Sequence, residues 1–354
     1  MKSTTTLQDV AEFAGVSAKT VSRVVNGDPA VTEKTAKRVR KAIVTLDFTP
    51  NPHARSLRTG RDQTIALIVD SISDPFFAAL AEAVEEVARN AGLFLIVANA
   101  GDSAARERKV VESLLRRSIS GLILVPCLLS YETRNSPLGT NGVPVVFVDR
   151  PSTDMDADTV LVDNAESTQR AVAHLIAHGH RRIGFVGTAI DRFTIRERLS
   201  GYCAALEAAG LAFDPELVVN GPYKAPVELF HVDELLNGPD PVTAIFSGDN
   251  VSSLSVVSLL HQSARVDVAF VGFDDFLVSE ALIPPVTVVR QDPVLMGRTA
   301  AEMLMRRIAG DKSPPAHVIL PTSLIVRGSG EIRPPVSCAA GPVNEGRLQR
   351  RNHG

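Results

Sequence analysis

A short segment near the N-terminus carries residues that can read the edges of DNA bases. Lys19 and Arg23 are hydrogen-bond donors of the kind that suits O6 and N7 of guanine in the major groove. We expect one helix start to face base edges through Ser17, Ala18, Lys19, Ser22 and Arg23. Ser17, Thr20 and Asn26 are better suited to phosphates, which fix the position of a protein on DNA rather than its sequence preference.

A second group of polar residues follows apolar runs further along the chain. Asp70, Asp149 and Asp274 each come just after such a run, and ligands of open α/β sheets bind beyond the carboxyl ends of strands. Phe76 and Arg198 each stand near the start of a predicted helix. Carboxylates and an arginine can fix hydroxyl groups by bidentate hydrogen bonds, and an aromatic ring can cover an apolar face. Together these five residues suit a polyhydroxylated, sugar-like ligand.

Three short helices are predicted to position the DNA-reading residues. Thr6 followed by Asp9 predicts a capping box at the start of the first helix, and Gly15 predicts its end. Ser17 is the predicted cap of the second helix and Thr32 that of the third. Two helices joined by a glycine-containing turn and braced by a third form a helix-turn-helix, whose second helix enters the major groove.

The charge of the chain is unevenly distributed. Residues 1–60 contain ten lysines and arginines against five acids, a net charge of +5, whereas the remainder carries −8. A small basic head on a larger acidic body predicts that the head alone meets a polyanion. The alternative is a solvated basic three-helix domain that binds no DNA.

Composition excludes several classes of protein. With 45% hydrophobic and 22% charged residues, the chain is neither disordered nor fibrous. The three cysteines, Cys127, Cys203 and Cys338, are too few and scattered for a disulfide framework or a zinc site. No apolar run approaches the roughly 20 residues of a membrane helix, and the N-terminus lacks the apolar core of a secretory signal. We therefore expect a cytoplasmic protein that does not contact membranes.

From Thr64 onward, short buried strands alternate with amphipathic helices, a pattern typical of parallel α/β sheets. Helices ending near Gly92 and Gly210 each feed a strand, so the body repeats itself as two lobes. The expected strands are Ile65–Val69, Leu93–Val97, Leu122–Val125, Val145–Val148, Ile183–Val186, Ala244–Phe246, Ala269–Val271 and Val286–Val289.

Residues 6–26 resemble, almost position for position, the DNA-binding head of the lactose/galactose-repressor family. The resemblance continues through Phe48-Thr49-Pro50-Asn51-Pro52 and into the body, as far as about Gly328. It implies a helix-turn-helix head followed by a two-lobed α/β body of the periplasmic-binding-protein kind. It also implies a hinge helix at 51–60 that forms on operator DNA, with Leu57 wedged into the minor groove. With the hinge and the helix caps included, the further residues expected to contact DNA are Thr6, Thr32, Asn51, Ala54, Leu57 and Arg58.

In the family's fold the two lobes exchange strands, which implies a division into four parts. We expect a head at 1–50, a hinge at 51–60, a body at 61–330 and a disordered tail at 331–354. Within the body, lobe one spans about 61–162 and 291–322, and lobe two spans about 163–290 and 323–330.

The resemblance supports the same cleft residues. Phe76 matches the family's ring-contacting aromatic, Arg198 its ligand-binding arginine and Asp274 its ligand-binding aspartate, and Asp149 matches a cleft position. The chain departs from the pattern at Gly248, where the family usually has asparagine, and at Pro293, where several members have an aromatic residue.

These observations predict a sequence-specific transcriptional regulator, a repressor that binds operator DNA as a homodimer and responds to a sugar, polyol or nucleoside. One alternative is a regulator whose body meets a protein co-regulator, and another is an enzyme with a DNA-binding head. We expect no enzymatic activity, no catalytic residue and no cofactor, because no nucleophile motif, P-loop or dinucleotide loop is present. His174, His178 and His180 resemble a metal cluster, but no cysteine or acid completes it, so we expect no metal.

Overall fold

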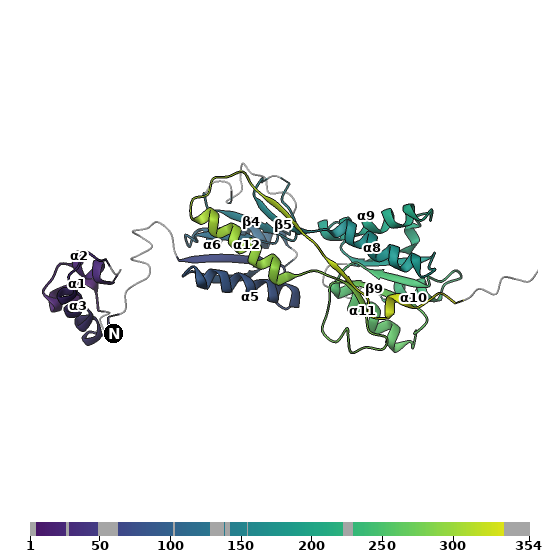
Figure 1. Ribbon diagram of the computed structural model, residues 1–354, viewed down its shortest axis with the longest axis horizontal. Helices are drawn as coiled ribbons and strands as arrows, with labels where there is room; N and C mark the ends of the chain where they lie inside the picture. Colours follow the sequence, from purple (N-terminus) through teal and green to yellow (C-terminus); the bar gives the residue numbers. More distant parts are fainter. Residues whose placement is uncertain are drawn as a thin grey trace, which may run out of the picture.

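The structure, a computed structural model, describes residues 5–25, 28–48, 63–101, 103–127, 138, 142–153, 155–221 and 229–335. It contains a three-helix head and a body of two α/β lobes (Figure 1). This is the fold class that the sequence predicts. None of the described helices combines the length and apolar character that a membrane span requires.

The head consists of α1 (Leu7–Ala14), α2 (Ala18–Val25) and α3 (Glu33–Thr45). The predicted capping box is present, since the Thr6 hydroxyl accepts from Asp9 N–H and the Asp9 carboxylate accepts from Thr6 N–H. Gly15 ends α1 in the left-handed conformation, which leaves room for the tight turn into α2. Thr32 precedes α3 as predicted, but its hydroxyl lies against Thr35 Oγ1 instead of capping the helix. Apolar residues of all three helices, Val10, Val21 and Val39 among them, form one small core.

Lobe one is built on a six-stranded sheet in the order β11-β5-β4-β3-β1-β2, parallel throughout. Its strands are β1 (Thr64–Val69), β2 (Phe94–Asn99), β3 (Gly121–Leu124), β4 (Val145–Val148), β5 (Asp158–Val162) and β11 (His317–Leu320). Side chains alternate along β1, so Ile65, Leu67 and Val69 pack under α5 (Pro75–Asn90) and α12 (Pro293–Ile308). Ala66 and Ile68 face α6 (Ala104–Leu115) on the other side. Helices therefore cover both faces, which explains why the inner strands are apolar throughout.

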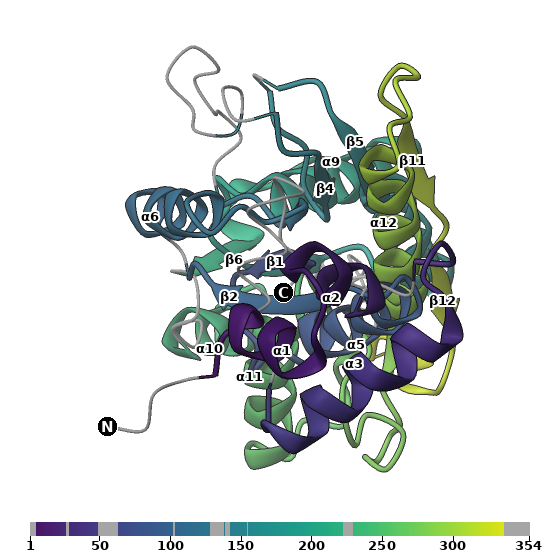
Figure 2. The ribbon, with the colours of Figure 1, turned by 90° about the vertical axis from the view of Figure 1, so that its left-hand side faces the viewer.

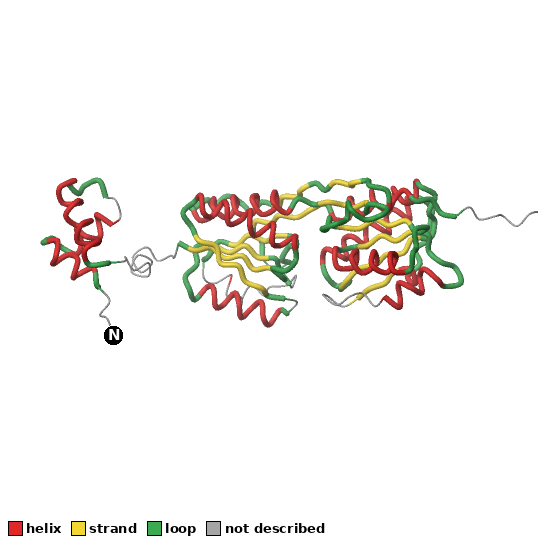
Figure 3. Tube along the Cα trace, turned by 90° about the horizontal axis from the view of Figure 1, so that it is seen from below, coloured by secondary structure: helices red, strands yellow, loops and turns green. Residues whose placement is uncertain are grey.

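Lobe two repeats this arrangement with the order β12-β10-β9-β8-β6-β7. Its strands are β6 (Ile183–Thr188), β7 (Val218–Gly221), β8 (Ala244–Ser247), β9 (Ala269–Phe273), β10 (Thr287–Arg290) and β12 (Ser323–Ile325), the last one antiparallel. One face packs against α8 (Asn164–Ala177) and α9 (Phe193–Ala208), and the other against α10 (Leu229–Asn237) and α11 (Asn250–Gln262). The 3-10 turns η1 (Pro215–Leu217) and η2 (Ser329–Glu331) complete the lobe, and Figure 3 shows both sheets between their helices.

The chain passes between the two sheets three times: between β5 and α8, between β10 and α12, and between β11 and β12. Two of these crossings are joined, because Asp163 Oδ1 accepts from the backbone N–H of Thr322 at 3.0 Å. The rotated view in Figure 2 shows α12 and β11 on one side of lobe one and α6 on the other. Such short connections between two lobes are the places where a hinge can form.

Candidate functional site

The exposed face of α2 presents the residues predicted to read DNA. Ser17, Lys19 and Arg23 are exposed, and Ala18, Thr20 and Ser22 are half-buried. Val21, fully buried in the head core, holds the opposite face of the helix in place. Ser17 Oγ accepts from Thr20 N–H at 3.2 Å and so caps the helix. The arrangement leaves Lys19 and Arg23 directed away from the core, as a helix that enters a groove requires.

Of the remaining residues predicted to contact DNA, some lie in the described part of the chain and some do not. Thr6 and Thr32 are exposed at the starts of α1 and α3. Asn26, Asn51, Ala54, Leu57 and Arg58 lie outside the described residues.

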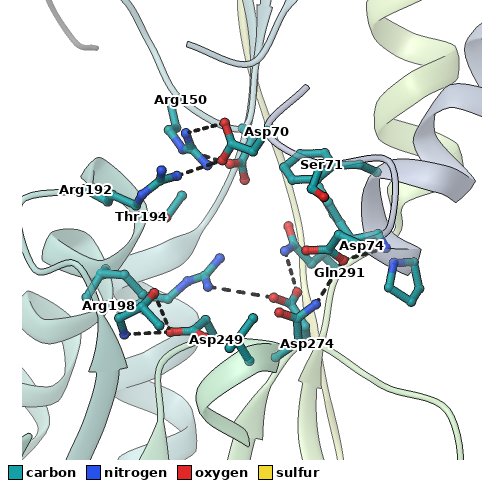
Figure 4. Close-up of a pocket in the computed structure, with 18 of the residues that line it drawn as sticks. Asp70, Ser71, Asp74, Arg150, Arg192, Thr194, Arg198, Asp249, Asp274 and Gln291 are labelled. Carbon is teal, nitrogen blue, oxygen red and sulfur yellow. Dashed lines mark hydrogen bonds and ion pairs between the residues drawn. The ribbon is translucent and has the colours of Figure 1, made fainter. Parts of the chain in front are cut away.

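A cavity of about 380 Å³ lies between the two lobes. Its walls come from the carboxyl ends of strands and from helix starts in both lobes, as the general rule for open α/β sheets requires. The five residues expected at a ligand site, Asp70, Phe76, Asp149, Arg198 and Asp274, all line it. Figure 4 shows the polar side chains of the two lobes pointing toward one another across this space.

Asp70, at the end of β1, is bound by an arginine from each lobe. Arg150 of lobe one donates to Asp70 Oδ2 at 2.6 Å, and Arg192 of lobe two donates to the same atom at 2.7 Å (Figure 4). All three side chains are almost completely buried. Burial alone would raise the pKa of Asp70, but the two guanidinium groups outweigh it and hold the pKa below its usual value. Asp70 therefore joins the lobes as an ionised carboxylate.

Arg198, on α9, is fixed by groups of its own lobe. Its Nε donates to Asn164 Oδ1 at 2.8 Å and its Nη1 donates to the Gly248 carbonyl at 2.7 Å. The guanidinium lies 3.5 Å from the centre of the Phe273 ring, and Nη1 is 3.9 Å from Asp274 Oδ2. These contacts set a planar donor against the cavity beside a carboxylate, a geometry suited to paired hydroxyls.

Asp149 and Asp274 occupy matching places in the two lobes, directly after β4 and β9. Both take a positive φ, 68° and 71°, a region that residues other than glycine seldom adopt and that often marks a functional site. Burial raises the pKa of both carboxyls, that of Asp274 to about 6, although Gln291 donates a hydrogen bond to Asp274 Oδ1 at 2.5 Å. Each carboxylate therefore gains from a further hydrogen-bond donor in the cavity.

The start of α5 supplies the aromatic wall and a second contact across the cleft. Asp74 Oδ1 caps the helix by accepting from Phe76 N–H at 3.0 Å, and the same oxygen accepts from Asn250 Nδ2 of lobe two at 3.0 Å. Pro75 occupies the first helical position, where its missing N–H costs nothing. Phe76 lies half-buried against the edge of Phe77, with ring centroids 5.1 Å apart.

Sequence reasoning did not foresee the part played by Arg192. This residue stands at the N-terminal boundary of α9, six positions before Arg198, and no motif separates it from the other arginines of that segment. Arg150 is adjacent to Asp149, and Gln291 lies on the second crossing between the lobes. These positions in the sequence were only a weak indication that either residue would line the cavity.

Gly248 departs from the family pattern for a visible reason. A Cβ at this position would lie 3.0 Å from the ring of Phe185, a tight contact that the ring would have to relieve by a small shift. Its carbonyl still contributes by binding Arg198, and Asn250, two residues on, supplies an amide that lines the cavity. Pro293 serves as the first residue of α12, whose cap is Asp292.

Comparison with known proteins agrees with both parts of this architecture. Residues 6–51 match the family of bacterial regulatory proteins of the lacI type, and residues 172–330 match a periplasmic binding protein-like domain. The HTH-type transcriptional regulator CelR of Thermobifida fusca is 35% identical over 335 residues, which cover 92% of this chain and 98% of CelR. The chain belongs to the LacI family.

Solved structures of LacI-family regulators superpose on more than nine-tenths of the chain. A lac repressor dimer bound to operator and an anti-inducer has a TM-score of 0.79 at 26% identity, covering 93% of this chain and 99% of that one. A complex of CelR with cellobiose has a TM-score of 0.69 at 33% identity, covering 92% and 99%. The family membership and the head together make this chain a DNA-binding transcriptional regulator, as the sequence predicts.

Proposed function

We propose that the chain represses transcription from a near-palindromic operator as a homodimer, and that a sugar-like effector in the cleft controls its operator affinity. The observation that carries this proposal is the cavity itself, because its walls are shared between two lobes that the backbone joins at three crossings. The body is then a sensor, without enzymatic activity, cofactor or metal. We place this regulator in the cytoplasm, where its DNA is.

The roles of the individual residues follow from their positions. In the head, Lys19 and Arg23 read base edges, with Ala18 and Ser22 beside them at the same edges, while Ser17 and Thr20 contact phosphates. Asn26, Thr6, Thr32 and the hinge residues Asn51, Ala54, Leu57 and Arg58 complete the DNA contacts. In the body, Arg198 and Asp274 bind effector hydroxyls, Phe76 covers the ring, and Asp149 and Asp70 shape the site from lobe one.

Control of DNA affinity works by a shift between conformations of the body. An effector that contacts both lobes favours the closed relation between them, which alters the spacing of the paired hinges in a dimer. In the domain division that we propose, the hinge at 51–60 connects this body, at 61–330, to the DNA-binding head at 1–50. By linkage, operator DNA must change effector affinity by the same factor, typically about 5–150-fold.

The proposed operator specificity can be tested without knowing the target genes. Duplexes selected from a random pool by the purified chain should bind about 10³ times more tightly, or better, than scrambled duplexes at physiological salt. Equal affinity for selected and scrambled duplexes would contradict sequence-specific recognition.

A further inference from the structure

The interlobe cleft carries an excess of acidic side chains. Its lining includes five aspartates and three arginines: Asp70, Asp74, Asp149, Asp249, Asp274, Arg150, Arg192 and Arg198. A ligand in the cavity therefore meets a surplus of negative charge unless the arginines are directed at it.

The arginines are engaged by the protein's own acceptors. Arg150 and Arg192 both bind Asp70, and Arg150 also donates to the carbonyl of Pro126 at 3.1 Å. Arg198 binds Asn164 and Gly248 and stacks on Phe273. A phosphate or carboxylate could recruit Arg150 or Arg192 only by breaking a buried ion pair with Asp70, which is costly in a site removed from water. At Arg198 an anion would lie beside the carboxylate of Asp274, which is 3.9 Å from the guanidinium.

The aspartates, in contrast, are poised to accept. Asp74 and Asp274 each accept a hydrogen bond from an amide, and a carboxylate has room for about four donors. Burial and mutual repulsion disfavour the ionised form of Asp74, Asp149 and Asp274. Hydroxyl donors relieve this cost, and another anion increases it.

We infer that the effector is an uncharged, hydroxyl-rich molecule, and that phosphorylated sugars, sugar acids and nucleotides are excluded from the cleft by its charge. This inference rests on the proposed function, because it assigns a chemical class to the effector of that site. It makes Asp74, Asp149 and Asp274 determinants of specificity as well as of binding.

Isothermal titration of the full chain with matched pairs tests the inference. The pairs are cellobiose and cellobionate, glucose and glucose 6-phosphate, ribose and ribose 5-phosphate, and adenosine and AMP, with inorganic phosphate alone as a further probe. We expect a neutral member to bind and its anionic partner to bind at least about tenfold more weakly, the effect of roughly 1.4 kcal/mol. An anionic member that binds more tightly than its partner, binding of inorganic phosphate in the cleft, or no binding by any neutral member would overturn the inference.

Variants that remove one charge test whether the aspartates of the cleft cause the preference for neutral ligands. Asp74→Asn keeps the size and the helix-capping ability of the side chain, since asparagine is also a good cap, but removes one charge from the cleft. The ratio of the affinity for the neutral member to the affinity for its anionic partner should fall by about tenfold. Asp240→Asn, at an exposed position outside the cleft, removes the same charge and should leave the preference unchanged. An unchanged preference in Asp74→Asn would overturn charge as the cause.

Failure of this inference can be distinguished from failure of the proposed function. Operator selection reports on the head and on regulation as such, whereas the titrations report only on the cleft. Tight binding of a sugar phosphate by a chain that still selects an operator would refute the inference and leave the regulator assignment intact.

Discussion

The Arg23 guanidinium is half-exposed on α2 and lies 3.4 Å from Asp28 Oδ2, an exposed ion pair of small energetic value. It is therefore available to a base edge at little cost. Arg23→Ala should lower operator affinity by about 1–3 kcal/mol and relax base preference at one position, as measured by fluorescence anisotropy on selected and singly altered duplexes.

Arg40→Ala is the matched control, since Arg40 is similarly exposed on α3 and pairs with Glu33 at 3.3 Å. It should weaken binding to all duplexes about equally or not at all. An equal loss on selected and random DNA for Arg23→Ala would show that Arg23 contacts only the phosphate backbone.

Glu107 provides a residue-scale test of the energetics of lobe one. Burial raises its pKa to about 7, and its Oε2 accepts from Cys127 N–H at 2.7 Å. Since the folded pKa exceeds the ordinary 4.5, the folded state binds more protons between those values, and stability falls as pH rises through that window. Glu107→Gln should abolish this fall and gain up to about 3 kcal/mol relative to the natural chain at pH 8.

Urea unfolding of both proteins at pH 5 and pH 8 measures this difference. Glu112 lies on the same helix but is half-exposed and 3.8 Å from Arg116. The difference in free energy of unfolding between Glu112→Gln and the natural chain should therefore be about the same at the two pH values. A Glu107→Gln difference that is equal at pH 5 and pH 8 would contradict the raised pKa.

At the scale of elements, each lobe depends on a glycine where two helices meet. A Cβ on Gly201 of α9 would lie 2.1 Å from the Ala165 carbonyl of α8, and one on Gly297 of α12 would lie 2.5 Å from the Leu80 carbonyl of α5. Both neighbours are backbone atoms and cannot rotate away. Gly201→Ala should therefore destabilise the chain by about 1–3 kcal/mol, although alanine alone favours a helix by about 1 kcal/mol.

Thermal unfolding measures the effect of Gly201→Ala. Ser200→Ala, at the adjacent exposed position of α9, should change the free energy of unfolding by less than about 0.5 kcal/mol. A Gly201→Ala chain as stable as the natural one would show that α8 and α9 can separate without cost.

The elements that sequence predicted and missed differ in one physical respect. Each of the eight expected strands is an apolar run that corresponds to a strand of the structure, and all but β2 consist mostly of buried residues. The missed strand β5 begins at Asp158, whose charge is buried only because Arg307 binds it at 2.7 Å. The missed strands β11 and β12 carry exposed positions at the edges of their sheets, and β7 is an edge strand of four residues. An apolar run reveals an interior strand, and also the six-residue edge strand β2, but it does not reveal a long-range ion pair or an edge strand of three or four residues.

The same limit applies to the cleft. Asp149 and Asp274 could be found because they follow strands, and Phe76 and Arg198 because they also match a known family. Arg192 could not be found, because its importance lies in a partner, Asp70, that stands 122 residues away. The positive φ of the two aspartates is likewise invisible in the sequence.

At the scale of the whole molecule, polar contacts between described residues join the lobes across the cleft, among them Arg192 with Asp70 and Asn250 with Asp74. Arg192→Met removes the first contact but leaves Asp70 paired with Arg150, so the chain should still fold. We expect its lobes to open more often, seen as a larger radius of gyration in X-ray scattering and as weaker effector binding.

Arg298→Met is the control for this variant, because Arg298 pairs with Glu86 at 3.4 Å within lobe one. Its radius of gyration and effector affinity should match those of the natural chain. Unchanged scattering from Arg192→Met would show that the contact between Arg192 and Asp70 does not set the relation between the lobes.

The most direct test of the account is the affinity of the full chain for its selected operator, measured with and without a saturating neutral sugar that binds the cleft. The account predicts a change of about 5–150-fold, matched by an equal change in sugar affinity when operator is present, and abolished in Arg198→Met. Operator affinity that stays the same with the cleft filled would contradict the claim that the two-lobed body controls the DNA-binding head.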